Sequence, residues 1–176
     1  HLKNATPATV SRGGVLFIND ADVGWRPFFE SWLSKYRKKD EHAFNVFSLA
    51  LNTYINDAFV DDLKNKTHIT PVCEMGQVNS LTCIVDYLYN TLHTNKAQHD
   101  MMKRYREESK EDEIKAIYEA FFVFGGMWGY GASLDEDKLS FSNSWKSASK
   151  IKFPDVGQCF DFFYDPLKAQ WVHWDE

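Results

Sequence analysis

The sequence is poor in cysteine and in positive charge. Its three cysteines, Cys73, Cys83 and Cys159, include no C-x-x-C pair. This spacing argues against a disulfide framework and predicts reduced, buried thiols in a cytosolic protein. Lys and Arg number 20 against 25 Asp and Glu, which gives a net charge of −5. This excess of acid argues against nucleic acid or an anionic membrane surface as a partner.

Motifs that carry chemistry are also missing. The phosphate loop G-x-x-x-x-G-K-[ST] and an acidic Walker B strand are absent, and G-x-G-x-x-G is not met after a strand. No ligand spacing typical of zinc occurs, so we expect no metal site, and no Ser/His/Asp or Cys/His pattern supports a nucleophile. The uncharged run 120–134 is shorter than the roughly 18–20 residues that a membrane crossing needs. Taken alone, the residues contain no complete active site.

What is present indicates a mainly α-helical globular fold, because aromatic residues make up 16% and apolar residues 44% of the chain. Apolar side chains repeat at helical spacing in about five segments. The first predicted helix begins at Pro27 and ends in the cationic turn of Lys35, Arg37, Lys38 and Lys39. The others are Glu41 to about Lys64, about Met75 to Leu92, about Ile114 to Gly131, and Asp135 to Ser149. In the last, Leu139, Phe141 and Trp145 are expected to face inward.

Three other segments need separate interpretation. Residues 93–113 mix both signs of charge and predict either a solvated helix or a mobile loop. His68, in the loop of residues 65–71, is expected to be an ordinary loop histidine rather than a zinc ligand. Gly125 and Gly129 form G-x-x-x-G, which outside a membrane predicts the close approach of another backbone.

The C-terminal residues predict a β-hairpin. Phe160, Phe162 and Tyr164 alternate along one strand, Val172 and Trp174 lie on the other, and Asp165-Pro166 starts a turn between them. We expect this hairpin to pack against the helices as a cap. The alternative is an aromatic platform for a peptide or sugar, in which Trp171 and Trp174 would be exposed.

Residues 4–19 predict a stiff polar loop followed by a strand. Pro7, Thr6 and Ser11 favour a non-helical path, and Val15–Ile18 forms a short apolar run typical of a buried strand. A lone strand needs sheet partners, so the chain looks like an excerpt from something larger. Arg12 lies on the loop, and its planar, permanently charged fork suits phosphate oxygens. Alternatively, Arg12 is a surface residue or half of a structural ion pair.

The sequence also resembles a known family. Several segments, in order along the chain, are similar to the second AAA+ module of dynein heavy chains, of the axonemal outer-arm type. They are Ala5–Phe17, Asp22–Pro27, Ser31–Leu33, Phe122–Leu134, Phe153–Asp155, Cys159–Asp165 and Trp171–Trp174.

The resemblance implies a division of the chain. Residues 1–24 would end the large AAA+ subdomain, 25–150 would be its helical lid, and 151–176 would be a linker and hairpin toward the third module. Arg12 would be an arginine finger for the ATP of the first module. ATP with Mg²⁺ would be bound mainly by other parts of the parent chain. We assign no further ATP-contacting residue, although one near Lys138 could reach the nucleotide of the second module.

The implied parent is a dynein ATPase that moves toward microtubule minus ends in the axoneme of a cilium or flagellum, within the cytoplasm and cytoskeleton. Its partners would be neighbouring AAA+ modules of the same heavy chain, the microtubule, and dynein intermediate and light chains. The alternative from a different class is a non-enzymatic helical adaptor or scaffold module.

Overall fold

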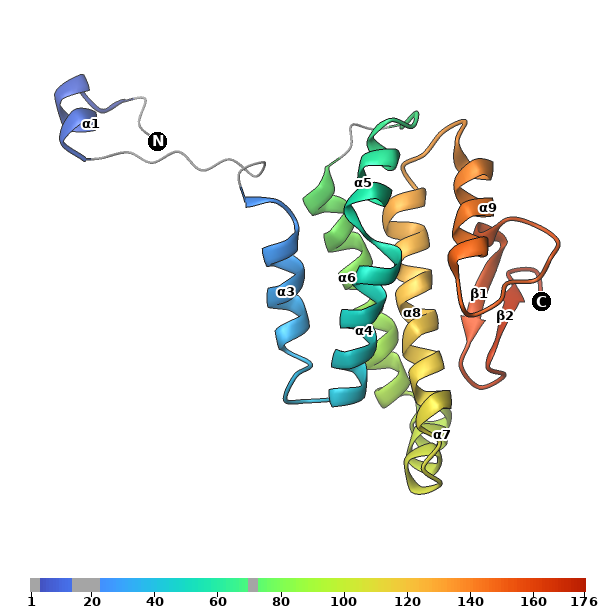
Figure 1. The fold of residues 1–176 in the computed structure, drawn as a ribbon. Helices are drawn as coiled ribbons and strands as arrows, with labels where there is room; N and C mark the ends of the chain where they lie inside the picture. The colour runs from blue at the N-terminus through green and yellow to red at the C-terminus, as the bar shows by residue number, and fades with distance from the viewer. Residues whose placement is uncertain (1–3, 14–22, 70–72) are drawn as a thin grey trace.

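The computed structural model describes residues 4–13, 23–69 and 73–176. Most of these residues form helices that stand side by side, with a two-stranded hairpin at one flank (Figure 1). The helices are α1 (Pro7–Gly13), α3 (Arg26–Ser34), α4 (Glu41–Tyr54), α5 (Asp57–Lys64), α6 (Glu74–Thr94), α7 (Lys96–Glu107), α8 (Glu111–Gly131) and α9 (Lys138–Ala148). A 3-10 turn, Cys159–Asp161, leads into β1 (Phe162–Asp165), which pairs antiparallel with β2 (Gln170–His173).

Helix α8 is the centre of the fold. Nearly all of its second half is buried, and it packs against α4, α6, α7, α9 and β1. Gly125 and Gly129 explain the close contact with α6, because a Cβ added at Gly129 would lie 3.0 Å from the backbone oxygen of Gln77, and one at Gly125 would lie 3.0 Å from that of Leu81. The predicted backbone approach at G-x-x-x-G is therefore confirmed. Within the described residues, no helix is both long and apolar enough to cross a membrane.

The segment 41–64 is two helices, so the prediction of one continuous helix was wrong. Ile55 is buried but leaves helical geometry, with φ −117° and ψ 66°. Asn56 then caps α5, because its side chain accepts a hydrogen bond of 2.9 Å from the backbone N–H of Phe59. Apolar spacing continues through the break, which is why periodicity alone did not reveal it.

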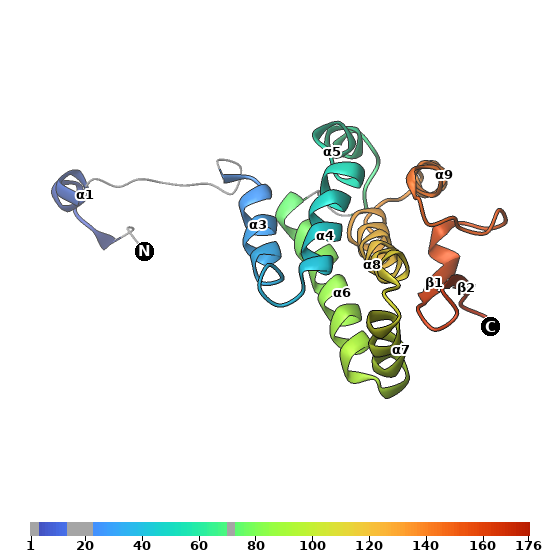
Figure 2. The ribbon, with the colours of Figure 1, turned by 60° about the horizontal axis from the view of Figure 1, so that its bottom comes forward.

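The polar segment after α6 takes the helical form of its two predicted alternatives. Helix α7 buries only Met101 and Met102 and leaves its charged residues outward. It lies beside the lower ends of α6 and α8 in both views (Figures 1 and 2). Of the residues predicted to face inward from α9, Phe141 and Trp145 do so, whereas Leu139 is 57% exposed.

The hairpin packs as a cap. Trp171 is only 6% exposed, and its ring stacks on Phe153 at 4.0 Å between centroids. Trp174, which follows β2, is 52% exposed and donates its indole N–H to the backbone oxygen of Phe160 at 3.0 Å. Phe160 lies in the 3-10 turn rather than in a strand. The alternative prediction, an aromatic platform with both tryptophans exposed, is therefore wrong because Trp171 is buried.

The loop predicted around Arg12 is instead a short helix, α1. Thr6 accepts a hydrogen bond of 3.3 Å from the backbone N–H of Thr9 through its hydroxyl, and Pro7 occupies the first helical position. Both residues suit a helix start, so the features that had indicated a loop begin a helix. Helix α1 lies apart from the bundle in Figures 1 and 2. The strand expected at 15–18 lies outside the described residues.

Candidate functional site

The first candidate site residue, Arg12, lies in the last turn of α1. None of the residues of α1 is buried, and Arg12 itself is exposed. Among the residues that the structure describes, no carboxylate pairs with its guanidinium. A rigid cation fork on a short helix, facing outward, can meet an anion supplied by another part of a larger assembly. The alternative of a structural ion pair has no support among these residues.

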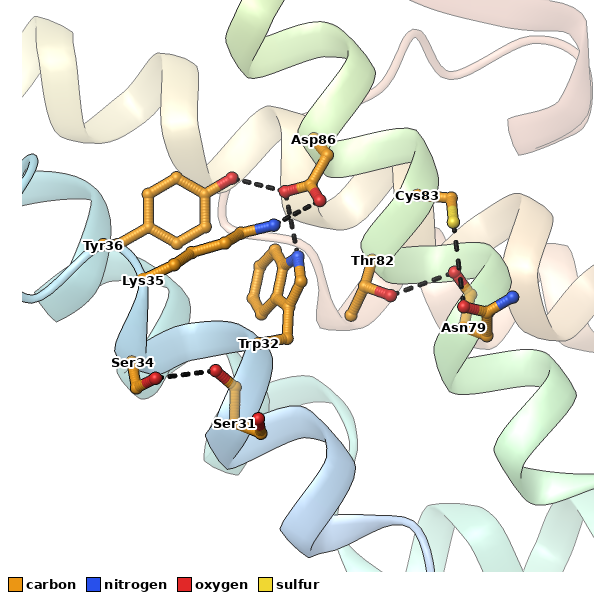
Figure 3. Close-up of polar contacts among 9 residues, drawn as sticks. All are labelled: Ser31, Trp32, Ser34, Lys35, Tyr36, Asn79, Thr82, Cys83 and Asp86. Atoms are coloured by element: carbon orange, nitrogen blue, oxygen red, sulfur yellow. Dashed lines mark hydrogen bonds and ion pairs between the residues drawn. The ribbon is translucent and has the colours of Figure 1, made fainter.

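A second cluster fastens α3 to α6 and centres on Asp86. Its Oδ1 atom accepts hydrogen bonds from the indole N–H of Trp32 at 2.9 Å and from the hydroxyl of Tyr36 at 2.6 Å. Lys35 pairs with the other carboxylate oxygen (Figure 3). Burial and the hydrogen bond to Asp86 raise the pKa of Tyr36 well above its usual range. The phenol therefore stays protonated and continues to donate.

A third cluster centres on Asp40, in the turn before α4. Its carboxylate accepts from the backbone N–H of Ala43 at 3.0 Å, from the hydroxyl of Tyr118 in α8 at 2.6 Å and from that of Tyr89 in α6 at 3.3 Å. Arg106 of α7 adds an ion pair at 3.2 Å. One side chain, only 5% exposed, thus joins four helices.

His93 lies beside this cluster. Its ring centroid is 4.5 Å from that of Tyr89, and its Nε2 atom is buried without a partner among the described residues. Burial lowers the pKa of His93, and the nearby positive charge of Arg106 lowers it further. The imidazole is therefore held neutral where the bundle is packed.

The other candidate residues occupy ordinary positions. His68 connects its loop to α5 and to the turn after α8, with its ring nitrogens 2.8 Å from the Leu63 backbone oxygen and 3.0 Å from the Ser133 hydroxyl. Lys138 begins α9 and is partly exposed. The described ranges hold no group of three or more His, Cys, Asp or Glu side chains that could bind a metal.

The cysteines differ from the expectation of three buried thiols. Cys73 and Cys83 are exposed, and only Cys159 is buried. Burial raises the pKa of the Cys159 thiol to about 11. Spacing in the sequence could not distinguish them, because Cys73 precedes α6, Cys83 lies within α6 and Cys159 lies in the 3-10 turn, and only the folded chain decides which of these positions is covered.

Sequence reasoning missed Asp40 and Asp86 as organising residues. The available signal for Asp40 was its position before Glu41, where an aspartate caps a helix. For Asp86 the chain gave no local signal, because its partners lie 50 to 54 residues away.

This arrangement, a helical bundle with a C-terminal hairpin and a separate helix carrying an exposed arginine, has the form of a helical lid subdomain. Comparison with known proteins agrees. The family model described as dynein heavy chain AAA lid domain matches residues 45–176. The chain belongs to this family.

Relatives align over nearly the whole chain. Dynein axonemal heavy chain 11 of Sus scrofa is 32% identical over 182 residues, which covers 99% of this chain and 4% of that protein. The ciliary dynein beta chain of Tripneustes gratilla is 33% identical over 183 residues, with 100% and 4% covered. Dynein axonemal heavy chain 17 of Mus musculus is 34% identical over 183 residues, again with 100% and 4% covered.

The chain therefore spans about 4% of the length of these curated relatives. Their names are those of axonemal and ciliary dyneins, and they point to the cytoskeleton of the cilium or flagellum as the location. The chain therefore corresponds to the AAA lid region of a dynein heavy chain.

Proposed function

We propose that this chain is the lid end of the second AAA+ module in a dynein heavy chain, and that Arg12 is an arginine finger for the ATP of the first module. The observation that carries the proposal is the outward position of Arg12 on α1, without a carboxylate partner among the described residues. An arginine used for structure would be expected to pair with the bundle. The family assignment favours this function over the helical adaptor.

The chemistry would follow from charge. During ATP hydrolysis negative charge spreads over the transferred γ-phosphoryl group, and a fixed guanidinium placed there stabilises the transition state. ATP with Mg²⁺ would be held mainly by residues outside these 176. Arg12 is the one residue of this chain that we assign to ATP. An ATP contact by Lys138 would rest on nothing more than its location at the start of α9.

The bundle would act as a rigid lid. Asp40 connects four helices and Asp86 connects two, so a push on one helix moves the packed body as a unit. In this proposal residues 1–24 end the large subdomain, residues 25–150 form the lid, and residues 151–176 lead to the third module. The lid would relay the nucleotide state around the ring and toward minus-end-directed movement on a microtubule.

A surface beside the hairpin supports contact with another module. An apolar groove of about 460 Å³ runs between α6, α8 and the hairpin, with Tyr87, Phe124, Phe163 and Trp174 among its lining residues. Tyr87 and Trp174 are large exposed side chains, and an exposed apolar patch of this kind marks an interaction site. We assign it to the third AAA+ module of the same heavy chain. Intermediate and light chains would be partners of the parent complex.

The experiment is the substitution Arg12→Lys in the full-length heavy chain, with ATP turnover as the readout. Lysine keeps the charge but loses the planar fork, so turnover should fall strongly, toward the loss on the order of 10³ seen when a finger is removed. Arg104→Lys is the matched control, because Arg104 is an exposed arginine on α7 that has no assigned role. Unchanged turnover in the Arg12 variant would discard the finger.

A further inference from the structure

Positive charge gathers in the turn between α3 and α4. Helix α3 ends at Ser34, so the cations expected in its last turn lie beyond it. All four of them are exposed: Lys35, Arg37, Lys38 and Lys39. The chain carries 25 acidic against 20 basic side chains, yet no acidic residue interrupts this run. The turn therefore has the opposite sign of charge to the chain as a whole.

The two carboxylates that the turn contacts are already satisfied. The Asp40 side chain is only 5% exposed and has four donors around it. One oxygen of Asp86 accepts hydrogen bonds from Trp32 and Tyr36, and the other pairs with Lys35 (Figure 3). Neither carboxylate is therefore available to the remaining cations of the turn.

Three of the four cations have no partner within the bundle. Among the described residues, no carboxylate pairs with Arg37, Lys38 or Lys39. Glu41, which follows the turn in the sequence, is exposed in the first turn of α4 and forms no ion pair with them. The charge of these three side chains is thus left to the solvent or to a partner.

Two of these cations are held in place without being neutralised. The guanidinium of Arg37 lies 5.0 Å from the ring centroid of Phe44, and the ammonium of Lys39 lies 4.7 Å from that of Tyr89. A cation–π contact orients a side chain but leaves its charge. The negative end of α3 accounts for Lys35 at the C-cap, because the effect of the helix dipole falls off within the last turn. The fold thus positions the side chains and leaves their charge uncompensated.

The positive surface continues onto α7, which lies at the same end of the bundle as the turn (Figure 1). Arg106 of α7 forms an ion pair with Asp40 at 3.2 Å, and 47% of its side chain is exposed. A hollow of about 260 Å³ lies beside the turn, with Lys35, Lys39 and Asn90 in its lining. Five exposed cations form this basic patch: Lys35, Arg37, Lys38, Lys39 and Arg106.

The arrangement of the charges indicates which kind of anion fits. The cations are separate charges distributed over a turn and a neighbouring helix, so they complement carboxylates distributed along a chain. A phosphate group is bound best by donors that converge on it. In the hollow a phosphate would also meet the like charge of Asp86, which is part of the lining. Runs of acidic residues, in contrast, are typical interaction segments.

We propose that the basic patch binds an acidic polypeptide segment, which it recognises by a run of Asp or Glu side chains. The proposal goes beyond the proposed function, because it uses neither Arg12 nor the groove at Trp174. Binding through exposed charges is fast and weakens as salt screens them. The partner would contact the α3–α4 turn and α7 together, which Asp40 already joins to each other.

Fluorescence anisotropy of a labelled oligo-glutamate peptide tests the proposal on the 176-residue chain, whose described residues bury one continuous core. We expect binding at low ionic strength that decreases as salt is added. The triple variant Arg37→Gln, Lys38→Gln and Lys39→Gln should bind about tenfold more weakly, because three exposed ion pairs are lost. Its unfolding temperature should stay close to that of the parent chain, since none of the three side chains pairs with a carboxylate among the described residues.

A second triple variant is the matched control. Lys150→Gln, Lys152→Gln and Lys168→Gln removes the same charge from exposed lysines before and within the hairpin. It should bind the peptide with the affinity of the parent chain. Equal weakening in the two triple variants would overturn the proposal, because the peptide would then follow the net charge of the chain and not the patch.

Carbodiimide coupling gives a readout that needs no variant. The reagent joins a carboxylate to a lysine amine that lies against it, so the bound peptide should become attached at Lys38 and Lys39 and not at Lys150 or Lys168. Mass spectrometry of the digested chain identifies the attachment sites. Coupling distributed equally over the exposed lysines would overturn the proposal, as would the absence of binding at low salt.

Inorganic phosphate distinguishes the two kinds of anion. Phosphate and chloride at equal ionic strength should weaken peptide binding equally, because both act by screening. Displacement of the peptide by phosphate alone would make the patch a phosphate site and would overturn the proposal. Arg12 is unchanged in every variant, so none of these outcomes depends on its role in ATP turnover.

Discussion

Helix α1 and the bundle that follows it are built in opposite ways. The bundle buries its aromatic and aliphatic side chains and satisfies its central carboxylates with several donors each. Helix α1 buries nothing, and its arginine has no carboxylate partner among the described residues. The charges that hold the bundle together are paired within it, whereas the exposed arginine of α1 is available to a neighbour. This contrast separates the structural charges of the lid from its candidate functional charge.

The largest expected loss of stability is at Asp40. Asp40→Ala removes the cap of α4, the acceptor of the buried Tyr118 hydroxyl and the partner of Arg106. We expect the free energy of unfolding to fall by about 3 kcal/mol, because hydrogen bonds to charged groups contribute about 1.5–3 kcal/mol and a helix cap about 1 kcal/mol. Urea unfolding of the 176-residue chain measures this.

Asp100→Ala is the control for that variant, since Asp100 is exposed on α7 and its side chain makes no hydrogen bond or ion pair among the described residues. Its effect should stay within about 0.5 kcal/mol. Equal effects of the two substitutions would break the contrast between paired core charges and free surface charges.

An intermediate effect is expected where α6 and α8 touch. Gly129→Ala places a Cβ 3.0 Å from the backbone of both Gln77 and Leu81, so the helices must separate. Overpacking of this kind costs about 1–3 kcal/mol. Gly76→Ala is the control, because among the described residues the added Cβ would contact Cys73 alone, at 3.5 Å, and alanine favours a helix by about 1 kcal/mol over glycine. The two changes should shift the unfolding midpoint in opposite directions, and a shift of the same sign would contradict the close packing.

The smallest effect concerns His93. Because its pKa is lowered in the folded state, the unfolded chain takes up a proton first as the pH falls through about 6.5. Stability should therefore be full above that pH and decrease between about pH 7 and pH 5. His93→Gln should show a flatter dependence of unfolding temperature on pH over this window. His42→Gln, a partly exposed histidine of α4, should keep the pH dependence of the parent chain, and an unchanged slope in His93→Gln would assign the dependence to other groups.

Long apolar patterns were the part of the fold that the sequence could predict. Helix α8 was expected from about Ile114 and begins at Glu111. It could be predicted because its apolar face, with small residues, is uninterrupted and has one stable arrangement. The break at Asn56 and the start of α1 after Thr6 were missed for a shared reason. Both depend on single capping side chains, which weigh little against the apolar spacing or turn residues around them.

The residues of the candidate sites were likewise predicted only in part. Resemblance drew attention to Arg12, and the structure leaves it exposed. The carboxylates that organise the lid could not be foreseen, because Asp40 meets Tyr118 from 78 residues away and only the folded chain brings the two together. Leu139 shows the limit of periodicity in a short helix, where one more apolar position fits the pattern yet faces outward.

The most direct test compares two quantities in one variant. In Arg12→Ala of the full-length heavy chain, the account predicts an unchanged unfolding temperature together with an ATP turnover reduced on the order of 10³ or more. Asp40→Ala should show the opposite pattern, in which the fall in unfolding temperature is the main effect. An Arg12→Ala chain that hydrolyses ATP at the parent rate, or that loses turnover only because it unfolds, would contradict the proposal that this arginine serves a neighbouring module.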